Sequence, residues 1–326
     1  MTTTVELIQG NGEDVVTLRL HPISVATLRP LASLGFDLYL QRNRSNEPTL
    51  YRQRSYPLTQ EDIDRLVEAE VEALYITDLG CLRYEQYLQE NLDHFIENQT
   101  TPLSIRFRFL HDAAKLAFKG SFRIIKVHRT VEAALKVGLQ LTNLVCDCRL
   151  EPLGLFGMMR RDWQLFTHLT NVAGYAVLLA QRLGISDQAL LEEVAVGALL
   201  HDVGMRHVPA VLFQKETPLS QREQDLIRRH PQAGYEELCK VPDLTVGQLM
   251  MAYQHHERID GSGYPVRVTG DEIHWMAKLC SVVDAFNTMT CPQPHRKALD
   301  PDGVIEHLRE NAGTLYDKEM VRCWTT

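Results

Sequence analysis

Residues 255–265 read HHERIDGSGYP and place two adjacent histidines directly before a turn. Neutral imidazole is a ligand of Zn, Fe, Mn and Ni, so two neighbouring imidazoles suit a metal centre better than an apolar core. Gly261, Gly263 and Pro265 are residue types that favour turns. The stretch therefore predicts metal donors at the end of one element, and the remaining donors must come from elsewhere in the chain.

Four other sites place acidic or imidazole groups on or beside apolar helical patterns. His168 lies among apolar residues, His201-Asp202 ends the run AVGALL, His230 precedes a proline, and Asp284 interrupts LCSVVDAF. Each alone is explained equally well by a helix cap or a hydrogen bond, but burying several such groups is costly unless they are paired or metal-bound. Together they predict two metals bridged by Asp202. The other donors divide between the two sides, with His168, His201 and Asp284 on one and His230, His255 and His256 on the other.

The sequence around these donors predicts an all-α bundle. Segments 163–184, 187–204, 220–230, 244–256 and 272–289 carry apolar residues at helical spacing, and two shorter helices close the chain. Ser220 and Glu223 form a capping box, and Gly184 suits a left-handed helix end.

Residues 1 to about 80 predict a small mixed α/β domain, so the fold class is α+β overall. Segments 15–20, 36–42, 49–55 and 73–77 have the composition of strands, and a helix is expected from Thr59. We assign residues 1–100 to an N-terminal regulatory, sensory or assembly domain, 101–148 to a helical connector, and 149–326 to the domain that carries the donors.

Composition narrows the class of protein. The chain has 326 residues, of which 44% are hydrophobic and 23% charged, as in ordinary globular proteins. No signal-peptide pattern and no membrane-spanning run is visible, so a cytoplasmic location is expected. The net charge of −8 argues against a nucleic-acid polymer as partner. Seven scattered cysteines predict no disulfide framework, and Cys146 with Cys148 is a weak metal signal.

The ordered set of motifs resembles the HD superfamily of metal-dependent phosphohydrolases. The run from His255 to Pro265 matches the signature of its HD-GYP branch, HHExxDGxGYP. Other pieces that agree, in unbroken order, are HLTNVA at 168–173, HDVG at 201–204, HPQAG at 230–234, VVDAFNTMT at 282–290 and AGTLYD at 312–317. The resemblance covers about 160 residues and identifies 149–326 as an HD-GYP catalytic domain.

What the resemblance implies is a phosphodiesterase that hydrolyses cyclic di-GMP to pGpG, GMP or both through a metal-bridging hydroxide. Its cofactors would be two divalent ions, Fe or Mn first, with Ni, Zn or Mg as alternatives. The implied partners are cyclic di-GMP, diguanylate cyclase (GGDEF) domains contacted through the GYP loop, and a second copy in a homodimer. The alternative is a catalytically weak, metal-containing cyclic-dinucleotide sensor or interaction module.

The resemblance also assigns roles to residues. His201 and Asp202 would be catalytic, and the implied metal ligands are His168, His201, Asp202, His230, His255, His256 and Asp284. The implied substrate contacts are Arg206, Gly263, Tyr264, Arg296 and Lys297.

Three positions depart from the family pattern. Met205 stands where a lysine usually follows HDxG, and Gln293 replaces the first arginine of an Arg-Pro-Tyr-Arg element. Gln164 stands where three-metal members carry a glutamate, and a neutral amide is a weak metal ligand, which favours two metals. The changes at Met205 and Gln293 affect substrate binding more than metal binding.

Overall fold

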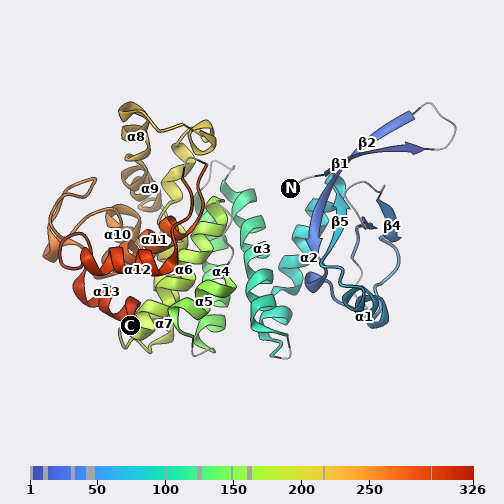
Figure 1. Cartoon of the computed structure of the whole chain (residues 1–326), viewed down its shortest axis with the longest axis horizontal. Helices are drawn as coiled ribbons and strands as arrows, with labels where there is room; N and C mark the ends of the chain where they lie inside the picture. The colour runs from blue at the N-terminus through green and yellow to red at the C-terminus, as the bar shows by residue number, and fades with distance from the viewer. Residues whose placement is uncertain are drawn as a thin grey trace. The chain divides into compact units, whose positions relative to one another are not determined.

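The structure is a computed structural model that describes residues 3–9, 14–30, 34–41, 48–99, 101–122, 127–147, 150–159, 164–215, 217–294 and 296–326. The chain divides into two compact units, Met1–Phe109 and Leu110–Thr326. The sheet lies in the first unit and the second is helical, so the predicted α+β class is confirmed (Figure 1). Cys148 of the C-x-C pair lies outside the described residues.

The first unit is built on a five-stranded antiparallel sheet with the order β1-β2-β5-β3-β4. Its strands are β1 Thr3–Gln9, β2 Asp14–Ser24, β3 Leu38–Leu40, β4 Thr49–Arg52 and β5 Ala73–Thr77. The four predicted strands are confirmed, although β3 and β4 are shorter than expected. β1 was not predicted. Leu74 and Ile76 alternate with half-buried residues along β5, which places this strand at the core of the unit.

One helix of this unit lies between β4 and β5 and another follows β5, and a short 3-10 turn, η1 Val25–Thr27, follows β2. α1 Gln60–Glu68 begins at the predicted position, because Thr59 and Asp62 exchange side-chain and backbone hydrogen bonds in a capping box. α2 Asp78–Glu97 packs against β2 and β5. Its Tyr84 and Tyr87 lie edge-on to the ring of Phe36, and the three rings form part of the hydrophobic core of this unit.

The segment predicted as a connector is largely two long helices. α3 Leu103–Phe122 crosses the division between the units, and α4 Val127–Cys146 belongs to the second unit, where it packs against α6 and α7. The proposed boundaries at 100 and 148, and the role of the N-terminal domain, stay predictions.

The second unit is a helical bundle centred on α6 Leu165–Arg182 and α7 Gln188–Leu200, which pack against each other. Residues 167–180 of α6 are all buried, so this helix forms the middle of the core. The surrounding elements are α5 Pro152–Met158, η2 Val203–His207, η3 Ala210–Gln214, α8 Gln221–Ile227, α9 His230–Leu238, α10 Val246–Gln254, η4 Gly270–Glu272, α11 Trp275–Thr290, α12 Pro301–Glu310 and α13 Lys318–Thr325.

The helix ends follow from local chemistry. Gly184 has φ +89° directly after α6, and Ser220 with Glu223 forms the predicted capping box of α8. The single helix expected over 220–230 was wrong, since α8 ends at Ile227 and His230 opens α9. Pro231 has no backbone N–H and is tolerated only in a first turn, which explains the new start.

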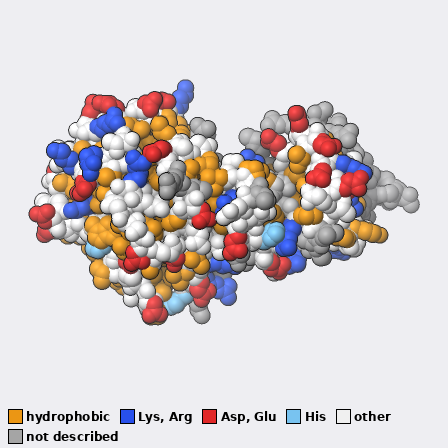
Figure 2. Space-filling view, turned by 90° about the horizontal axis from the view of Figure 1, so that it is seen from below, with side chains coloured by type: hydrophobic (Ala, Val, Ile, Leu, Met, Phe, Trp, Pro, Cys, Tyr) orange, Lys and Arg blue, Asp and Glu red, His pale blue; other side chains and the backbone are white. Residues whose placement is uncertain are grey.

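The described surface mixes charges of both signs. On the face drawn in Figure 2, acidic side chains lie among basic and apolar ones. None of the described helices is both long and apolar enough to cross a membrane.

Candidate metal centre

The seven predicted donors come together from five helical segments of the second unit. His168 lies on α6, His201 and Asp202 directly follow α7, and His230 opens α9. The remaining three are His255 and His256 after α10, and Asp284 on α11. All of them are at least 92% buried except His256, which is half-buried. Side chains separated by more than a hundred residues therefore share one water-poor site.

Asp202 lies at the middle of this cluster because its two carboxylate oxygens face different imidazoles. Oδ1 is 3.0 Å from Nε2 of His230 and 3.6 Å from Nε2 of His255. Oδ2 is 3.5 Å from Nε2 of His201 and 3.6 Å from Nε2 of His168. The carboxylate is thus placed to be shared between two ions.

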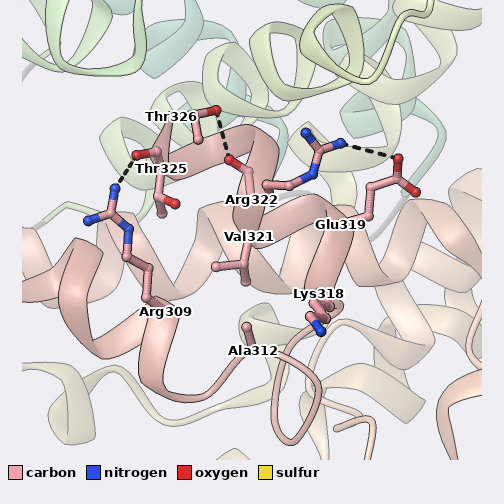
Figure 3. A pocket seen from close by; sticks show the side chains of 8 residues that line it. All are labelled: Arg309, Ala312, Lys318, Glu319, Val321, Arg322, Thr325 and Thr326. Carbon is pink, nitrogen blue, oxygen red and sulfur yellow. Dashed lines mark hydrogen bonds and ion pairs between the residues drawn. The ribbon is translucent and has the colours of Figure 1, made fainter.

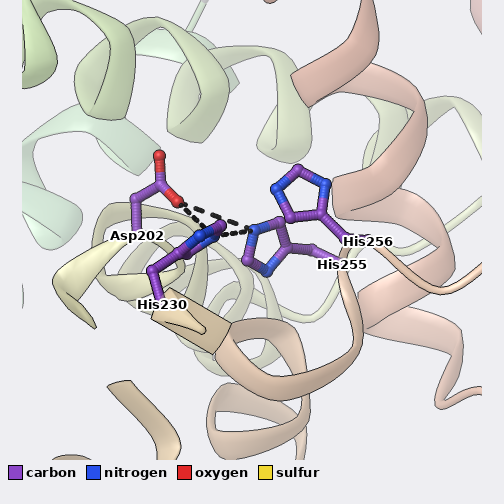
Figure 4. Close-up of side chains that lie close together, drawn as sticks. All are labelled: Asp202, His230, His255 and His256. Atoms are coloured by element: carbon purple, nitrogen blue, oxygen red, sulfur yellow. Dashed lines mark hydrogen bonds and ion pairs between the residues drawn. The ribbon is translucent and has the colours of Figure 1, made fainter. Parts of the chain in front are cut away.

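Two groups of donors have the spacing of a metal site. Within each group the ligand atoms lie within 4.8 Å of one another, and Asp202 belongs to both. One group is His168, His201 and Asp202, and the other is Asp202, His230, His255 and His256, whose side chains converge in Figure 4. Asp284 extends the first group, since its Oδ1 is 3.4 Å from Nε2 of His168.

The hydrogen bonds of three histidines leave Nε2 free to bind a cation. Nδ1 lies 2.6 Å from the Ala198 carbonyl in His201, 2.7 Å from the Ile227 carbonyl in His230, and 2.9 Å from the Met251 carbonyl in His255. A carbonyl only accepts, so each Nδ1 carries a hydrogen and each Nε2 faces the cluster, where a neutral ring would offer its lone pair to an ion.

Pairs of these Nε2 atoms approach each other closely. The distance is 3.3 Å between His168 and His201, and 3.2 Å between His230 and His255. At these distances one nitrogen of each pair can hold a proton that the other accepts, and a divalent ion near both nitrogens could take the place of that proton. Imidazole nitrogen with carboxylate oxygen is a donor set suited to Fe, Mn, Ni or Zn, so the residues fit divalent ions.

Electrostatics favours the protonation states that ligands need. Burial lowers the pKa of His168, His255 and His256, and the neighbouring imidazoles of His255 and His230 lower that of His256 further. Burial alone would raise the pKa of Asp202, but His201 and His230 hold it well below its usual value. Burial thus favours the neutral form of His168, His255 and His256, while the carboxylate of Asp202 stays ionised.

His230 is the donor that behaves differently. Burial acts to lower its pKa, but the attraction and hydrogen bond of Asp202 outweigh burial and raise it. His230 is thus the imidazole whose protonated form Asp202 favours, and a bound ion would compete with that proton.

A close backbone crossing holds His230 beside Asp202. A Cβ atom added to Gly204 would lie 2.0 Å from the His230 carbonyl oxygen and 2.6 Å from the nitrogen of Gly234. Only glycine fits at such a crossing, which brings η2 against the first turn of α9.

Glu257 of the signature folds the following loop. Its buried carboxylate accepts hydrogen bonds from the backbone N–H groups of Val266, at 2.7 Å, and Arg267, at 3.0 Å. A Cβ on Gly263 would lie 2.4 Å from Cα of Glu257, so the loop packs directly on the backbone of the signature. Gly263 therefore has a backbone role in this structure, and its predicted contact with substrate stays a prediction.

Tyr264 places an aromatic ring at the edge of the cluster. Its ring centroid is 4.7 Å from that of His256, and its backbone N–H donates to the His256 carbonyl at 3.2 Å. Burial, with the charges of Asp202 and Asp284, raises the pKa of its hydroxyl, which stays protonated at neutral pH. The Tyr264–Pro265 peptide bond is cis.

Sequence reasoning missed Arg258, which ties the loop after α10 to α11. Its Nη1 donates to the Ser281 hydroxyl of α11 at 2.6 Å and to the Glu257 carbonyl at 2.9 Å. The guanidinium also lies 5.1 Å from the ring centroid of Tyr316. Arg258 stands inside the signature, but nothing in the sequence shows that its partner is Ser281.

The cations predicted to hold substrate have different surroundings. Arg206 has a side chain that is 8% exposed, and it pairs with Glu237 at 3.3 Å. The guanidinium of Arg296 donates to the Thr288 carbonyl, whereas Lys297 is exposed. Their roles toward substrate stay predictions.

The three departing positions lie around the site. Met205 is half-buried in η2, and its N–H donates to the Asp202 carbonyl at 2.9 Å. Gln164 is an exposed residue at the N-cap of α6, where its carbonyl accepts from His168 N–H. Gln293 exchanges backbone hydrogen bonds with Arg296 in a tight turn.

A separate hollow of about 530 Å³ lies beside α12 and α13 (Figure 3). Its lining residues are Arg309, Ala312, Lys318, Glu319, Val321, Arg322, Thr325 and Thr326. Arg309 donates to the Thr325 carbonyl at 2.6 Å, and Arg322 lies 3.6 Å from Glu319. None of the seven donors lines this hollow, so it is not part of the metal centre.

Comparison with known proteins places this site in a family. A profile of the HD domain matches residues 151–320. The cyclic di-GMP phosphodiesterase response regulator RpfG of Xanthomonas campestris is 32% identical over 163 residues, which are 49% of this chain and 43% of RpfG. The 3'3'-cGAMP-specific phosphodiesterase 3 of Vibrio cholerae is 34% identical over 153 residues, 47% of this chain and 33% of that protein. The chain thus spans less than half the length of these two relatives.

A solved structure shows the same fold. Bd1817, an HDG"Y"P protein from Bdellovibrio bacteriovorus, superposes with a TM-score of 0.66 over 94% of this chain and 98% of its own, at 21% sequence identity. The family profile covers more than half of the chain, and the donors predicted from the HD and GYP motifs lie together. The chain belongs to the HD domain family.

Proposed function

We propose that the second unit is a metal-dependent phosphodiesterase that hydrolyses cyclic dinucleotides, with cyclic di-GMP as the first substrate to test. One observation carries the proposal: the two oxygens of Asp202 face two separate groups of buried imidazoles. A carboxylate shared in this way is the arrangement expected of a two-metal hydrolytic centre.

The proposed ligands follow from the distances. His168, His201 and Asp284 would hold one divalent ion, His230, His255 and His256 the other, and Asp202 both. Two bound divalent ions lower the pKa of a water molecule and stabilise negative charge on a phosphodiester. Fe or Mn is our first choice, and the exposed position of Gln164 supports two ions rather than three.

The reaction opens the ring of the dinucleotide. The oxygen of one water joins phosphorus, one P–O bond to a ribose oxygen breaks, and a proton passes to that leaving oxygen. The product is the linear dinucleotide pGpG, and a second hydrolysis would give GMP. The protein itself keeps Asp202 ionised, because the pKa of this carboxyl is lowered. It also excludes bulk water from the site by burying the donors.

The substrate class rests on what the relatives' names share. RpfG is named for cyclic di-GMP and the Vibrio cholerae protein for 3'3'-cGAMP. Both ligands are cyclic dinucleotides with two phosphodiester groups, and they differ in one base. We therefore propose the class first and cyclic di-GMP within it.

A second candidate is a metal-containing sensor or interaction module that binds a cyclic dinucleotide with little turnover. Two observations favour it: Met205 supplies no charge beside Asp202, and the nearby Arg206 is paired with Glu237. Contacts with GGDEF domains through the 255–265 loop, a homodimer and a cytoplasmic location remain proposals.

The test is to purify the full chain without oxygen, measure its metal content, and follow cyclic di-GMP and 3'3'-cGAMP by chromatography. We expect about two transition-metal ions per chain and formation of a linear dinucleotide. Finding no bound transition metal after reconstitution would contradict the proposal. Two ions with nucleotide binding but no product would favour the sensor.

A further inference from the structure

The metal centre is most accessible at His256. The other six donors are at least 92% buried, whereas His256 is half-buried. Tyr264 packs against its ring and is itself half-buried. A substrate phosphate can therefore approach the donors beside these two rings.

Arg228 lies on this accessible side. It is an exposed residue between α8 and α9, two positions before His230. The central carbon of its guanidinium lies 5.6 Å from the ring centroid of Tyr264, which is the distance of a cation–π contact. The cation, the Tyr264 ring and the His256 ring thus form a series that leads from solvent to the donors.

The charge of Arg228 is available to a ligand. In the described part of the chain no carboxylate pairs with its guanidinium, while its backbone N–H donates to the Gln224 carbonyl within the helix. Arg206, by contrast, is neutralised by Glu237, and the guanidinium of Arg296 is bound to the Thr288 carbonyl. Among these three arginines near the donors, Arg228 alone combines exposure with an uncompensated charge.

We propose that Arg228 is a substrate-binding residue that holds the second, uncut phosphate of a cyclic dinucleotide, in place of the cation that Met205 does not supply. The inference rests on the proposed function. A guanidinium is planar and can donate two parallel hydrogen bonds to phosphate oxygens, and its contact with the Tyr264 ring restricts where it lies. A substrate with a single phosphate gains nothing from such a contact, which makes the proposal testable.

The experiment compares Arg228→Ala and Arg228→Lys with Arg229→Ala in the metal-loaded full chain. Arg229 is the adjacent exposed arginine, so its removal changes the net charge equally. The two substrates are the cyclic dinucleotide that the wild type cleaves and bis(p-nitrophenyl) phosphate, which has one phosphodiester. Metal content is measured for each variant.

We expect Arg228→Ala to raise KM for the cyclic dinucleotide about tenfold or more, with kcat and metal content little changed. Arg228→Lys should recover only part of this loss, because an ammonium neither stacks in one plane nor binds two oxygens side by side. Arg229→Ala should match the wild type with both substrates, and Arg228→Ala should cleave bis(p-nitrophenyl) phosphate normally.

Two outcomes would overturn the inference: equal KM values for Arg228→Ala and Arg229→Ala, or an equal loss with both substrates in Arg228→Ala. Failure of the proposed function looks different, because the metal-loaded wild type would then neither bind nor cleave any cyclic dinucleotide.

Discussion

The Nδ1 atom of His168 lies 2.8 Å from the side-chain amide of Asn287, across a separation of 119 residues. Three other histidines of the centre face backbone carbonyls, whereas His168 faces a side chain that can either donate or accept. As oriented in the structure, the amide turns its Nδ2 toward His168, and its Oδ1 accepts from Nδ2 of Asn171 at 3.0 Å. For Nε2 of His168 to bind an ion, Nδ1 must carry the hydrogen, so the Asn287 amide would have to present its oxygen instead. Asn287 is buried on α11, one turn after Asp284, so it positions a ligand without being one.

Replacing Asn287 should change metal affinity in opposite directions. Asn287→Asp gives His168 an anionic acceptor, which makes Nε2 more basic and should tighten metal binding. Asn287→Ala removes the acceptor and should weaken binding about tenfold or more. Competition with a chelator measures affinity, and thermal unfolding of the metal-free variants separates this effect from a loss of fold. Equal affinities for the two variants would exclude this positioning role.

Removing Asp202 should empty both halves of the centre. Asp202→Ala takes away the carboxylate that both donor groups share, so we expect metal content and turnover to be lost together. Asp225→Ala is the matched control, since Asp225 is an exposed acid on α8, and it should retain both ions. A variant of Asp202 that still holds two ions per chain would refute the shared ligand.

Gly204→Ala should destabilise the fold far more than the addition of a single methyl group suggests. The new methyl group would meet the His230 carbonyl at 2.0 Å, and backbone cannot move aside as a flexible side chain can. We expect a loss of roughly 2–4 kcal/mol in unfolding free energy, measured in urea, with weaker metal binding. The control is Gly303→Ala on α12, where nothing lies within 4 Å; it should stabilise by about 0.4–1 kcal/mol.

Met205→Lys separates the two candidate functions. If Arg228 already holds the second phosphate, the added ammonium should change kcat/KM by less than about fivefold in the wild-type background. In the Arg228→Ala background the same change should restore much of the lost affinity. A large gain with Arg228 intact would instead indicate a centre that has drifted toward binding without turnover.

The Lys215–Glu223 pair should make stability depend on pH in the acid range. Hydrogen bonds from Lys215 and from Ser220 lower the pKa of Glu223 from 4.5 to about 2. A carboxyl with a depressed folded pKa stabilises the protein above its unfolded pKa, and this contribution is lost as the pH falls from 4.5 toward 2. The urea midpoint of wild type should therefore exceed that of Glu223→Gln at neutral pH. The difference should shrink below about pH 4.5; a constant difference would contradict the assignment.

Much of the second unit could be predicted from the sequence because its signals are local. Apolar spacing gave the positions of α6, α7, α10 and α11, and the capping box at Ser220 is made by residues three apart. The seven predicted donors could be singled out because acidic and imidazole groups stand out within apolar runs. The break between α8 and α9 was missed, although its cause, Pro231, is also local.

What could not be predicted depends on contacts between distant segments. The positioning role of Asn287 can be seen only from its contact with His168, and that of Arg258 only from its contact with Ser281. Arg228 shows no periodicity or motif that marks it, and its place above Tyr264 appears only once the loop after His256 is folded. The edge strand β1 escaped notice because pairing with β2 defines it.

The unequal burial of the donors has a kinetic consequence. With the other six predicted donors buried, the half-buried imidazole of His256 marks the route by which we expect an ion to leave or enter, and it is also where we expect the nucleotide to bind. A bound nucleotide would then block this route, and the ions would stay bound while the nucleotide is being cleaved. The centre would lose metal mainly between turnovers. The concentration of the nucleotide, rather than that of the metal ions, would then set how long the protein keeps its metal.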